Sequence, residues 1–168
     1  GIQTEEKFDD KFRPVEQKDA LKNLTQIEYD GDYGQKAVKD GRGLVTQYQH
    51  DIHGNVTKVT NDKGETLKLY YDYKDSLVAK TDPSGYSQVY LYDERGNMVT
   101  VYNYALLYFD DQGNLNSYSW DPNDVLTINY DAAGSPISIT DANKNISNIS
   151  YDSNGMVTGI EKASGLAI

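Results

Sequence analysis

One short motif recurs at a nearly constant interval along most of the chain, and this periodicity constrains the fold more than any other feature. An aromatic residue followed by aspartate marks each copy, and the aspartates occupy every twenty-first position, except that the interval after Asp93 is four positions shorter. A period of this size is typical of a supersecondary unit that stacks on its neighbours. The anchoring aspartates are Asp30, Asp51, Asp72, Asp93, Asp110, Asp131 and Asp152.

The residues just before each anchor predict one buried face. The third position before the anchor is apolar or aromatic in all seven copies, and the position directly before it is aromatic in six and His50 in the seventh. Side chains two residues apart in a strand point to the same face of a sheet. The predicted face comprises Ile27, Tyr48, Leu69, Tyr90, Leu107, Ile128 and Ile149, together with Tyr29, His50, Tyr71, Tyr92, Phe109, Tyr130 and Tyr151.

A tight turn explains the remainder of the motif. The aspartate carboxylate can accept hydrogen bonds from backbone N–H groups just after it, and a glycine three residues later can adopt the positive φ that closes a turn. A second turn signal, such as "DPSG" at 82–85, follows about half a period after the anchor. The structural glycines are Gly54, Gly96, Gly113, Gly134 and Gly155.

Two turns in each period predict hairpins in series. We therefore expect an all-β fold, with an antiparallel meander of about 14 short strands over residues 25–168. Open sheet edges invite aggregation, so we expect the sheet to curl or to close into a barrel. Residues 1–24 lie outside this pattern and are expected to form an N-terminal cap, a helical turn or irregular, that packs on the sheet through Phe8, Phe12, Val15 and Leu21 within a single domain.

One unit is irregular, and it is the candidate binding site. The Asp93 unit lacks the second turn signal, and the chain runs "VYNYALLYFD" where four positions are missing from the period. Aromatic rings stack on sugars and are favoured at protein interfaces. The candidate contact residues are Trp120, Tyr118, Tyr102 and Tyr104, although core packing or cross-strand pairing also explains them.

Charge and composition exclude several classes of function. The net charge is −10 and the pI is about 4.5, which disfavours nucleic acid and anionic membrane surfaces as partners. The chain has no cysteine, so neither a disulfide nor a thiolate site is available. No apolar run is long enough for a transmembrane helix.

Candidate reactive residues have simpler explanations as turn residues. His50, Asp51 and His53 stand together, but no third histidine completes a zinc site, and an aromatic substitute followed by a turn explains them. The repeated aspartates suit Ca²⁺ chemically, yet each one is explained by its own turn. Ser135 also lies at a turn. We expect no catalytic residue, cofactor or metal.

The motif aromatic-Asp-x-x-Gly-Asn-apolar resembles the YD repeat of the RHS family, over roughly residues 25–165. The resemblance implies long β-ribbons in bacterial secreted or cell-surface proteins, whose large members wrap a toxin in a hollow shell. This chain lacks the RHS core signature and a toxin domain that those members carry. We expect an extracytoplasmic protein whose coding sequence supplies a leader ahead of Ile2.

Three hypotheses about function follow from this resemblance and from the residues. The favoured hypothesis is a non-catalytic β-scaffold that binds a glycan or a surface protein. The alternatives are a glycoside hydrolase that uses two carboxylates, supported only by the 26 acidic residues, and a fragment of a toxin-enclosing shell.

Overall fold

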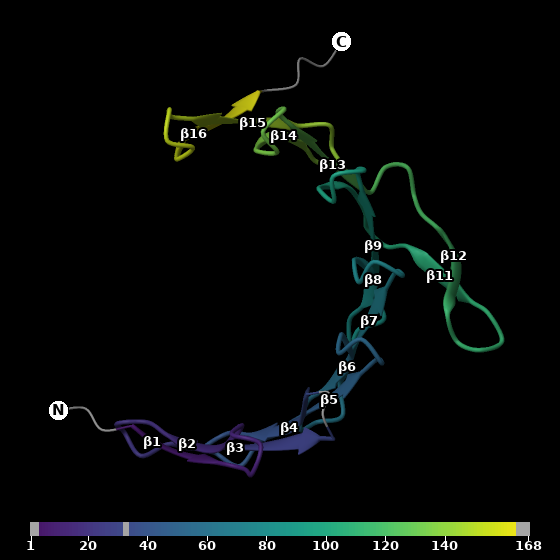
Figure 1. Ribbon diagram of the computed structural model, residues 1–168. Coiled ribbons are helices and arrows are strands. Elements are labelled where there is room, and N and C mark those ends of the chain that lie inside the picture. Colours follow the sequence, from purple (N-terminus) through teal and green to yellow (C-terminus); the bar gives the residue numbers. More distant parts are fainter. Residues whose placement is uncertain (1–3, 32–33, 164–168) are drawn as a thin grey trace. The chain divides into compact units, whose positions relative to one another are not determined.

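The computed structural model describes residues 4–31 and 34–163, which form sixteen β-strands and no helix (Figure 1). The strands are β1 (Glu5–Phe8), β2 (Pro14–Lys18), β3 (Leu24–Asp30), β4 (Gly34–Lys39), β5 (Val45–His50), β6 (Val56–Thr60), β7 (Thr66–Tyr71), β8 (Leu77–Thr81), β9 (Ser87–Tyr92), β10 (Met98–Tyr102), β11 (Leu106–Phe109), β12 (Leu115–Ser119), β13 (Val125–Tyr130), β14 (Pro136–Thr140), β15 (Ile146–Tyr151) and β16 (Val157–Ala163).

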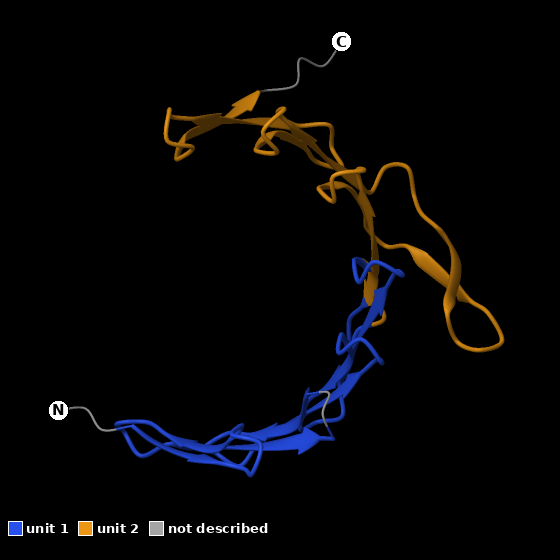
Figure 2. Ribbon diagram, in the orientation of Figure 1, with its two compact units in different colours: residues 1–77, 81–84 blue, residues 78–80, 85–168 orange. Residues whose placement is uncertain are grey.

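The chain divides into two compact units, which Figure 2 colours separately. Residues 1–77 and 81–84 form unit 1, and residues 78–80 and 85–168 form unit 2. In unit 1, strands β1 to β7 pair antiparallel in chain order. In unit 2, β9, β10, β13, β14, β15 and β16 pair in that order, and β11 pairs with β12 in a separate ribbon. The predicted all-β antiparallel meander is confirmed.

The N-terminal segment is part of the sheet, which corrects the expectation of a helical or irregular cap. Strands β1 and β2 form a hairpin, and β2 pairs with β3. The turn between β1 and β2 begins at Asp9, which lies one full period before Asp30 and is preceded by Phe8. The side chains of Phe12 and Leu21 are 88% and 84% exposed, so they do not cover the sheet.

The sequence pattern does not identify the N-terminal repeat, because the turns of this repeat contain no glycine. Phe12 and Lys22 take the positive φ that glycine adopts in other turns, at 61° and 66°. A positive φ is unfavourable for a residue with a side chain. The available signal was the aspartate spacing alone, since Asp9 and Asp19 continue the alternation of ten and eleven positions along the chain.

A β-bulge explains why the period is an odd number. After the Asp51 turn, His50 pairs with Val56, but the next pair is Gln49 with Lys58, so Thr57 has no partner across the hairpin. The turn that begins at Asn61 has no such shift. One extra residue in each period keeps the apolar positions on one face, whereas an odd period without it would reverse the faces.

The irregular unit is an insertion into an intact repeat and not a shortened repeat. The interval from Asp93 to Asp131 exceeds one period by seventeen positions. Strand β10 pairs directly with β13, and the Asn103 N–H donates to the carbonyl of Asp124 at 2.9 Å. In a regular turn the same bond joins the first and fifth residues, as between Asp40 and Leu44. The β11–β12 ribbon, residues 104–123, therefore leaves the sheet from within one turn.

The predicted buried face is only partly buried. Ile27 and Tyr90 are each 8% exposed, whereas most other positions of this face are half-buried and Phe109 is exposed. Leu107 lies in the ribbon and not in the main sheet. Within each unit, the described strands contact mainly their neighbours in the sheet. A face of the sheet that no other strand covers remains accessible, so deep burial is confined to a few positions.

The tyrosine of the motif links neighbouring hairpins. The hydroxyl groups of Tyr29, Tyr130 and Tyr151 donate to backbone carbonyls of the adjacent hairpin, at Pro14 (2.8 Å), Met98 (2.9 Å) and Pro136 (2.7 Å) respectively. Each accepting carbonyl belongs to the residue five positions after the aspartate that begins the preceding turn. This residue is the first of the strand that carries the bulge. A phenylalanine lacks this donor.

We expect Tyr151→Phe to lower the free energy of unfolding by about 1 kcal/mol, because one half-buried hydrogen bond is lost while the ring is retained. Urea denaturation measures the effect. The matched control is Tyr73→Phe, since Tyr73 is 83% exposed. Equal stability of both variants and the parent chain would show that these bonds do not stabilise the sheet.

Candidate functional site

The β11–β12 ribbon of unit 2 and its base hold three of the four predicted contact residues close together. The rings of Tyr102 and Trp120 stack with centroids 4.3 Å apart and planes inclined by 24°. The ring of Tyr118 lies 5.7 Å from Trp120 and 6.0 Å from Tyr102. The stack joins β10 of the main sheet to the end of β12, so these rings help to hold the base of the ribbon.

The fourth predicted residue, Tyr104, lies apart from this stack. Its ring packs edge-on against Tyr86 with centroids 4.6 Å apart, and its backbone has a φ of 50°. The next residue, Ala105, is buried and its N–H donates to the carbonyl of Ser87 at 3.0 Å. This segment therefore anchors the first strand of the ribbon to the start of β9.

The aromatic stack leaves part of the tryptophan accessible. Trp120 is 43% exposed, while Tyr118 and Tyr102 are half-buried. Burial raises the pKa of the Tyr118 phenol, and the neighbouring Tyr102 adds to this effect. The three rings thus contact one another, and Trp120 among them also faces solvent.

One face of β11 carries exposed apolar side chains. Leu106 and Tyr108 alternate along β11, so they share a face, and they are 63% and 50% exposed. The Tyr108 hydroxyl lies 3.4 Å from the Ser119 hydroxyl across the ribbon. No residue in 104–123 is a lysine or arginine, whereas Asp110, Asp111 and Asp121 are acidic.

The anchoring aspartates are occupied by their own turns. In the Asp93 turn, Oδ1 accepts from the backbone N–H groups of Arg95 and Asn97, Oδ2 accepts from the Asn97 side chain, and Gly96 has a φ of 85°. The turn after Asp30 includes residues 32–33, which lie outside the described residues. The same pair of backbone bonds is accepted by Asp51, Asp72, Asp110, Asp131 and Asp152.

These bonds also set the charge state of the turn carboxylates. Hydrogen bonds from the Asn97 side chain and backbone lower the pKa of Asp93, and bonds from Asn114 have the same effect on the pKa of Asp110. Bonds donated to a carboxylate stabilise its charged form. These aspartates are therefore negatively charged turn elements at neutral pH.

The two histidines occupy different positions in unit 1. His50 takes the aromatic position of the motif, and its ring lies against Gly34, where an added Cβ would stand 3.0 Å from Nε2. His53 Nδ1 lies 2.7 Å from Oδ1 of Asp75, which also accepts from the Asn55 side chain at 2.7 Å. Asp75 replaces the usual turn glycine and has a φ of 62°. The contact between His53 and Asp75 therefore links two neighbouring turns.

This histidine contact predicts a pH dependence of stability. The hydrogen bond with Asp75 raises the pKa of His53, so the contribution of His53 is complete below its unfolded pKa of about 6.5 and is lost as the pH rises through the higher folded value. His53 and Asn55 lower the pKa of Asp75, whose contribution is present above about pH 3.9 and is lost as the pH falls through the lower folded value.

We therefore expect the parent chain to melt at a higher temperature than the His53→Gln variant. The difference in melting temperature should be largest near pH 5.5 and should shrink towards pH 8. Both side chains are about half exposed, so added salt should weaken the effect. Thermal melts at several pH values test this expectation, with Asp75→Asn as a second variant. A difference that stays constant from pH 5.5 to 8 would contradict it.

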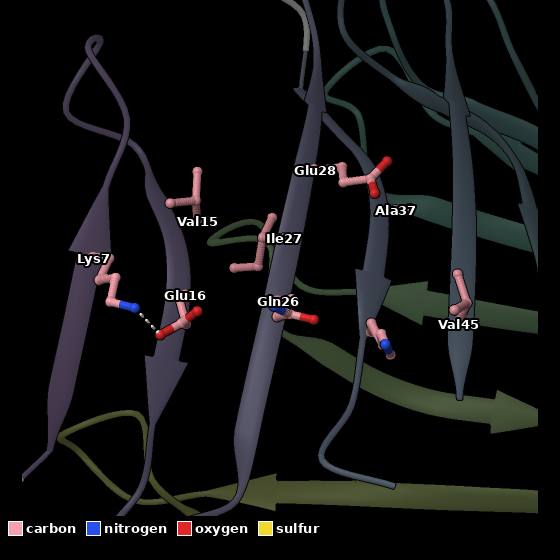
Figure 3. Close-up of a pocket in the computed structure, with 9 residues that line it drawn as sticks. Lys7, Val15, Glu16, Gln26, Ile27, Glu28, Ala37 and Val45 are labelled. Atoms are coloured by element: carbon pink, nitrogen blue, oxygen red, sulfur yellow. Dashed lines mark ion pairs between the residues drawn. The ribbon is translucent and has the colours of Figure 1, made fainter. Parts of the chain in front are cut away.

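A shallow hollow of about 370 Å³ lies on the sheet of unit 1, across β1 to β5 (Figure 3). Val15, Ile27 and Val45 supply apolar surface, and Lys7 forms an ion pair with Glu16 at 2.6 Å. Because Glu16 is already paired, the hollow presents apolar surface beside a surface ion pair rather than two convergent carboxyl groups. The rest of its lining comes from Gln26, Glu28, Ala37 and Lys39.

In the described part of the chain, no group of three or more histidine, aspartate or glutamate side chains is placed to hold a metal ion. The same residues include no helix that is long and apolar enough to cross a membrane.

The fold defines a class of protein, a β-repeat protein built from hairpins with aspartate turns. Within this class, residues 29–66 match the family model of the RHS repeat. This match confirms the resemblance to the YD-repeat, RHS-like family over those residues. No curated protein matches the sequence.

Solved structures with a similar fold are toxin components. A crystal structure described as TcdB2-TccC3-Cdc42 aligns with a TM-score of 0.67 and 16% identity, over 98% of this chain and 9% of that one. The Tc holotoxin pore of Photorhabdus luminescens aligns with a TM-score of 0.50 and 14% identity, over 89% of this chain and 12% of that one. The chain thus spans about a tenth of these proteins, and at such identities the likeness concerns the fold alone.

Proposed function

We propose that the chain is a non-catalytic, extracytoplasmic β-scaffold, a stretch of RHS-type sheet that binds a protein or glycan partner. This proposal rests on the hydrogen bonds that the repeated aspartate carboxylates accept within their own turns. Asp131, for example, accepts bonds from the backbone N–H groups of Ala133 and Ser135. Side chains that an enzyme would use for acid–base chemistry here maintain the repeat.

The charge state of these groups supports a scaffold over a hydrolase. A glycoside hydrolase needs one carboxylic acid whose pKa is raised, so that it protonates the leaving group. The turn hydrogen bonds lower the pKa of Asp93, Asp110 and Asp141 instead. A group with a lowered pKa is a poor proton donor at neutral pH.

The RHS likeness supports the structural part of the proposal. Tc toxin components share the fold, and this chain corresponds in length to about a tenth of them. We propose that the sheet curls with its tyrosine-bearing face inwards, as one stretch of a wall, and that the protein functions outside the cytoplasm. The apolar side chains on that face would then be covered by further protein.

The experiment compares turnover with stability in a set of turn variants. We expect no release of product from a panel of bacterial polysaccharides, and we expect Asp93→Ala and Asp131→Ala to lower the melting temperature. The matched control is Asp111→Ala, a neighbour of the anchor Asp110 that does not begin a turn. Polysaccharide turnover that one Asp or Glu substitution abolishes without changing the melting temperature would refute the proposal.

A further inference from the structure

We infer that the β11–β12 ribbon is a docking site for an extended, basic segment of a partner protein, which adds to the open edge of β11 as a third strand. This inference rests on the proposed scaffold function and names the chemistry of the partner. Four properties of the ribbon support it, namely its position in the repeat, its unpaired edges, its exposed apolar side chains and its charge.

The ribbon is an addition that the sheet does not need. The bond from Asn103 to Asp124 closes the turn of the sheet, and β10 pairs directly with β13. The stack of Tyr102 on Trp120 and the bond from Ala105 to Ser87 then hold the base of the ribbon. A segment that is anchored at its base and projects from an otherwise regular array is suited to contact another molecule.

The backbone of the ribbon suits another polypeptide strand. In the described part of the chain, β11 and β12 pair only with each other, so each has an outer edge without a strand partner. A two-stranded ribbon is marginally stable alone, and an edge of alternating N–H and C=O groups is a template for strand addition. A glycan does not reproduce this alternation of donors and acceptors.

The side chains on β11 define which strand fits. Leu106 and Tyr108 stand on one face and are mostly exposed, whereas Leu107 on the other face is half-buried opposite Tyr118. A partner strand with apolar residues at alternate positions would cover Leu106 and Tyr108 when it pairs with β11. The same alternation places its remaining side chains on the opposite face.

The charge around the ribbon favours a basic partner. Residues 85–132, which include the ribbon and the strands at its base, contain seven acidic residues and one cation, Arg95. That arginine is already engaged, since it donates to the carbonyl of Ala132 at 3.0 Å. Asp110 and Asp111 stand at the tip of the ribbon. Complementary charge accelerates association and selects the partner.

The experiment uses synthetic peptides and the full chain. The probe is an eight-residue peptide that alternates valine and lysine, and binding is followed by the fluorescence of Trp120, the only tryptophan, and by backbone amide NMR. We expect saturable binding that shifts the amides of residues 106–109 and weakens as salt is added. A valine–glutamate peptide should bind at least tenfold more weakly. A valine–lysine peptide with every backbone nitrogen methylated should not bind, because it has no backbone N–H donors.

A pair of double variants localises the site. We expect Leu106→Ser with Tyr108→Ser to weaken binding at least tenfold. The matched control is Leu21→Ser with Tyr73→Ser, which removes two side chains of the same types, at least as exposed, from unit 1 and should leave binding unchanged. Because all four side chains face solvent, both variants should remain folded, and their amide spectra verify this.

Four results would overturn the inference. The first three are no saturable peptide binding, amide shifts confined to the outer strands β1 or β16, and equal affinity for the lysine and glutamate peptides. Quenching of Trp120 by oligosaccharides in the absence of any peptide binding would also overturn it, in favour of a glycan site. None of these results alters the turnover and stability tests of the scaffold, so the two proposals fail separately.

Discussion

Replacement of Ile27 with alanine is expected to lower the free energy of unfolding by about 2–4 kcal/mol, as found for large-to-small changes at buried aliphatic positions. Ile27 is 8% exposed and lies in the third position before the anchor Asp30, opposite Val38 on β4. The change removes apolar contacts and leaves a cavity, because neighbouring strands in a hydrogen-bonded sheet cannot close in. Denaturant unfolding of unit 1 measures this loss.

The matched control for this prediction is Ile160→Ala. Ile160 pairs with Ile149 across the last hairpin but is 65% exposed, so its truncation should cost well under about 1 kcal/mol. If both variants lose the same stability, burial would not be the reason why the third position is apolar. Tyr90, also 8% exposed, provides a second buried test site in unit 2.

Removal of the ribbon is expected to preserve the sheet and to abolish peptide binding. The variant lacks residues 107–123 and carries Leu106→Gly, so that Asn103, Tyr104, Ala105, the new glycine and Asp124 form an ordinary five-residue turn with glycine at its fourth position. The deletion removes seventeen residues, which is the number of positions by which the interval from Asp93 to Asp131 exceeds one period. The β10–β13 register therefore remains unchanged.

Cooperative thermal unfolding and a strand-rich circular dichroism spectrum would verify that the excised chain folds. The control is a deletion of equal length at residues 132–148, which removes β14 and part of β15 and should abolish the cooperative transition of unit 2. Loss of folding in the ribbon variant would show that the ribbon is integral to the sheet. Retained peptide binding would place the docking site elsewhere.

The repeat aspartates connect local turn chemistry with the long-range sheet. Asp93 satisfies two backbone N–H groups through one carboxylate oxygen, and the preceding aromatic, Tyr92, ends the strand before the turn. Because each turn satisfies its own backbone, a repeat can tolerate an insertion without loss of register. The ribbon that starts after Asn103 shows such an insertion.

Local sequence patterns predict the strands and turns from residue 25 onwards and the family resemblance. Aspartate and glycine spacing are local signals, and the backbone N–H groups that bond to the Asp51 carboxylate belong to His53 and Asn55, within four positions of it. The alternation around Ile27 and Tyr29 likewise identified a strand and its inner face, because side-chain direction follows directly from backbone geometry.

Strand pairing and the depth of burial depend on contacts between residues that are far apart in the chain. The short interval after Asp93 predicts a shortened repeat, whereas the bond between Asn103 and Asp124 identifies an insertion. Spacing alone cannot separate these alternatives, because both keep the motif of Asp110 intact, and strand pairing depends on residues far apart in the chain. The positions of Trp120 beside Tyr102 and of Tyr104 beside Tyr86 follow from the same long-range pairing.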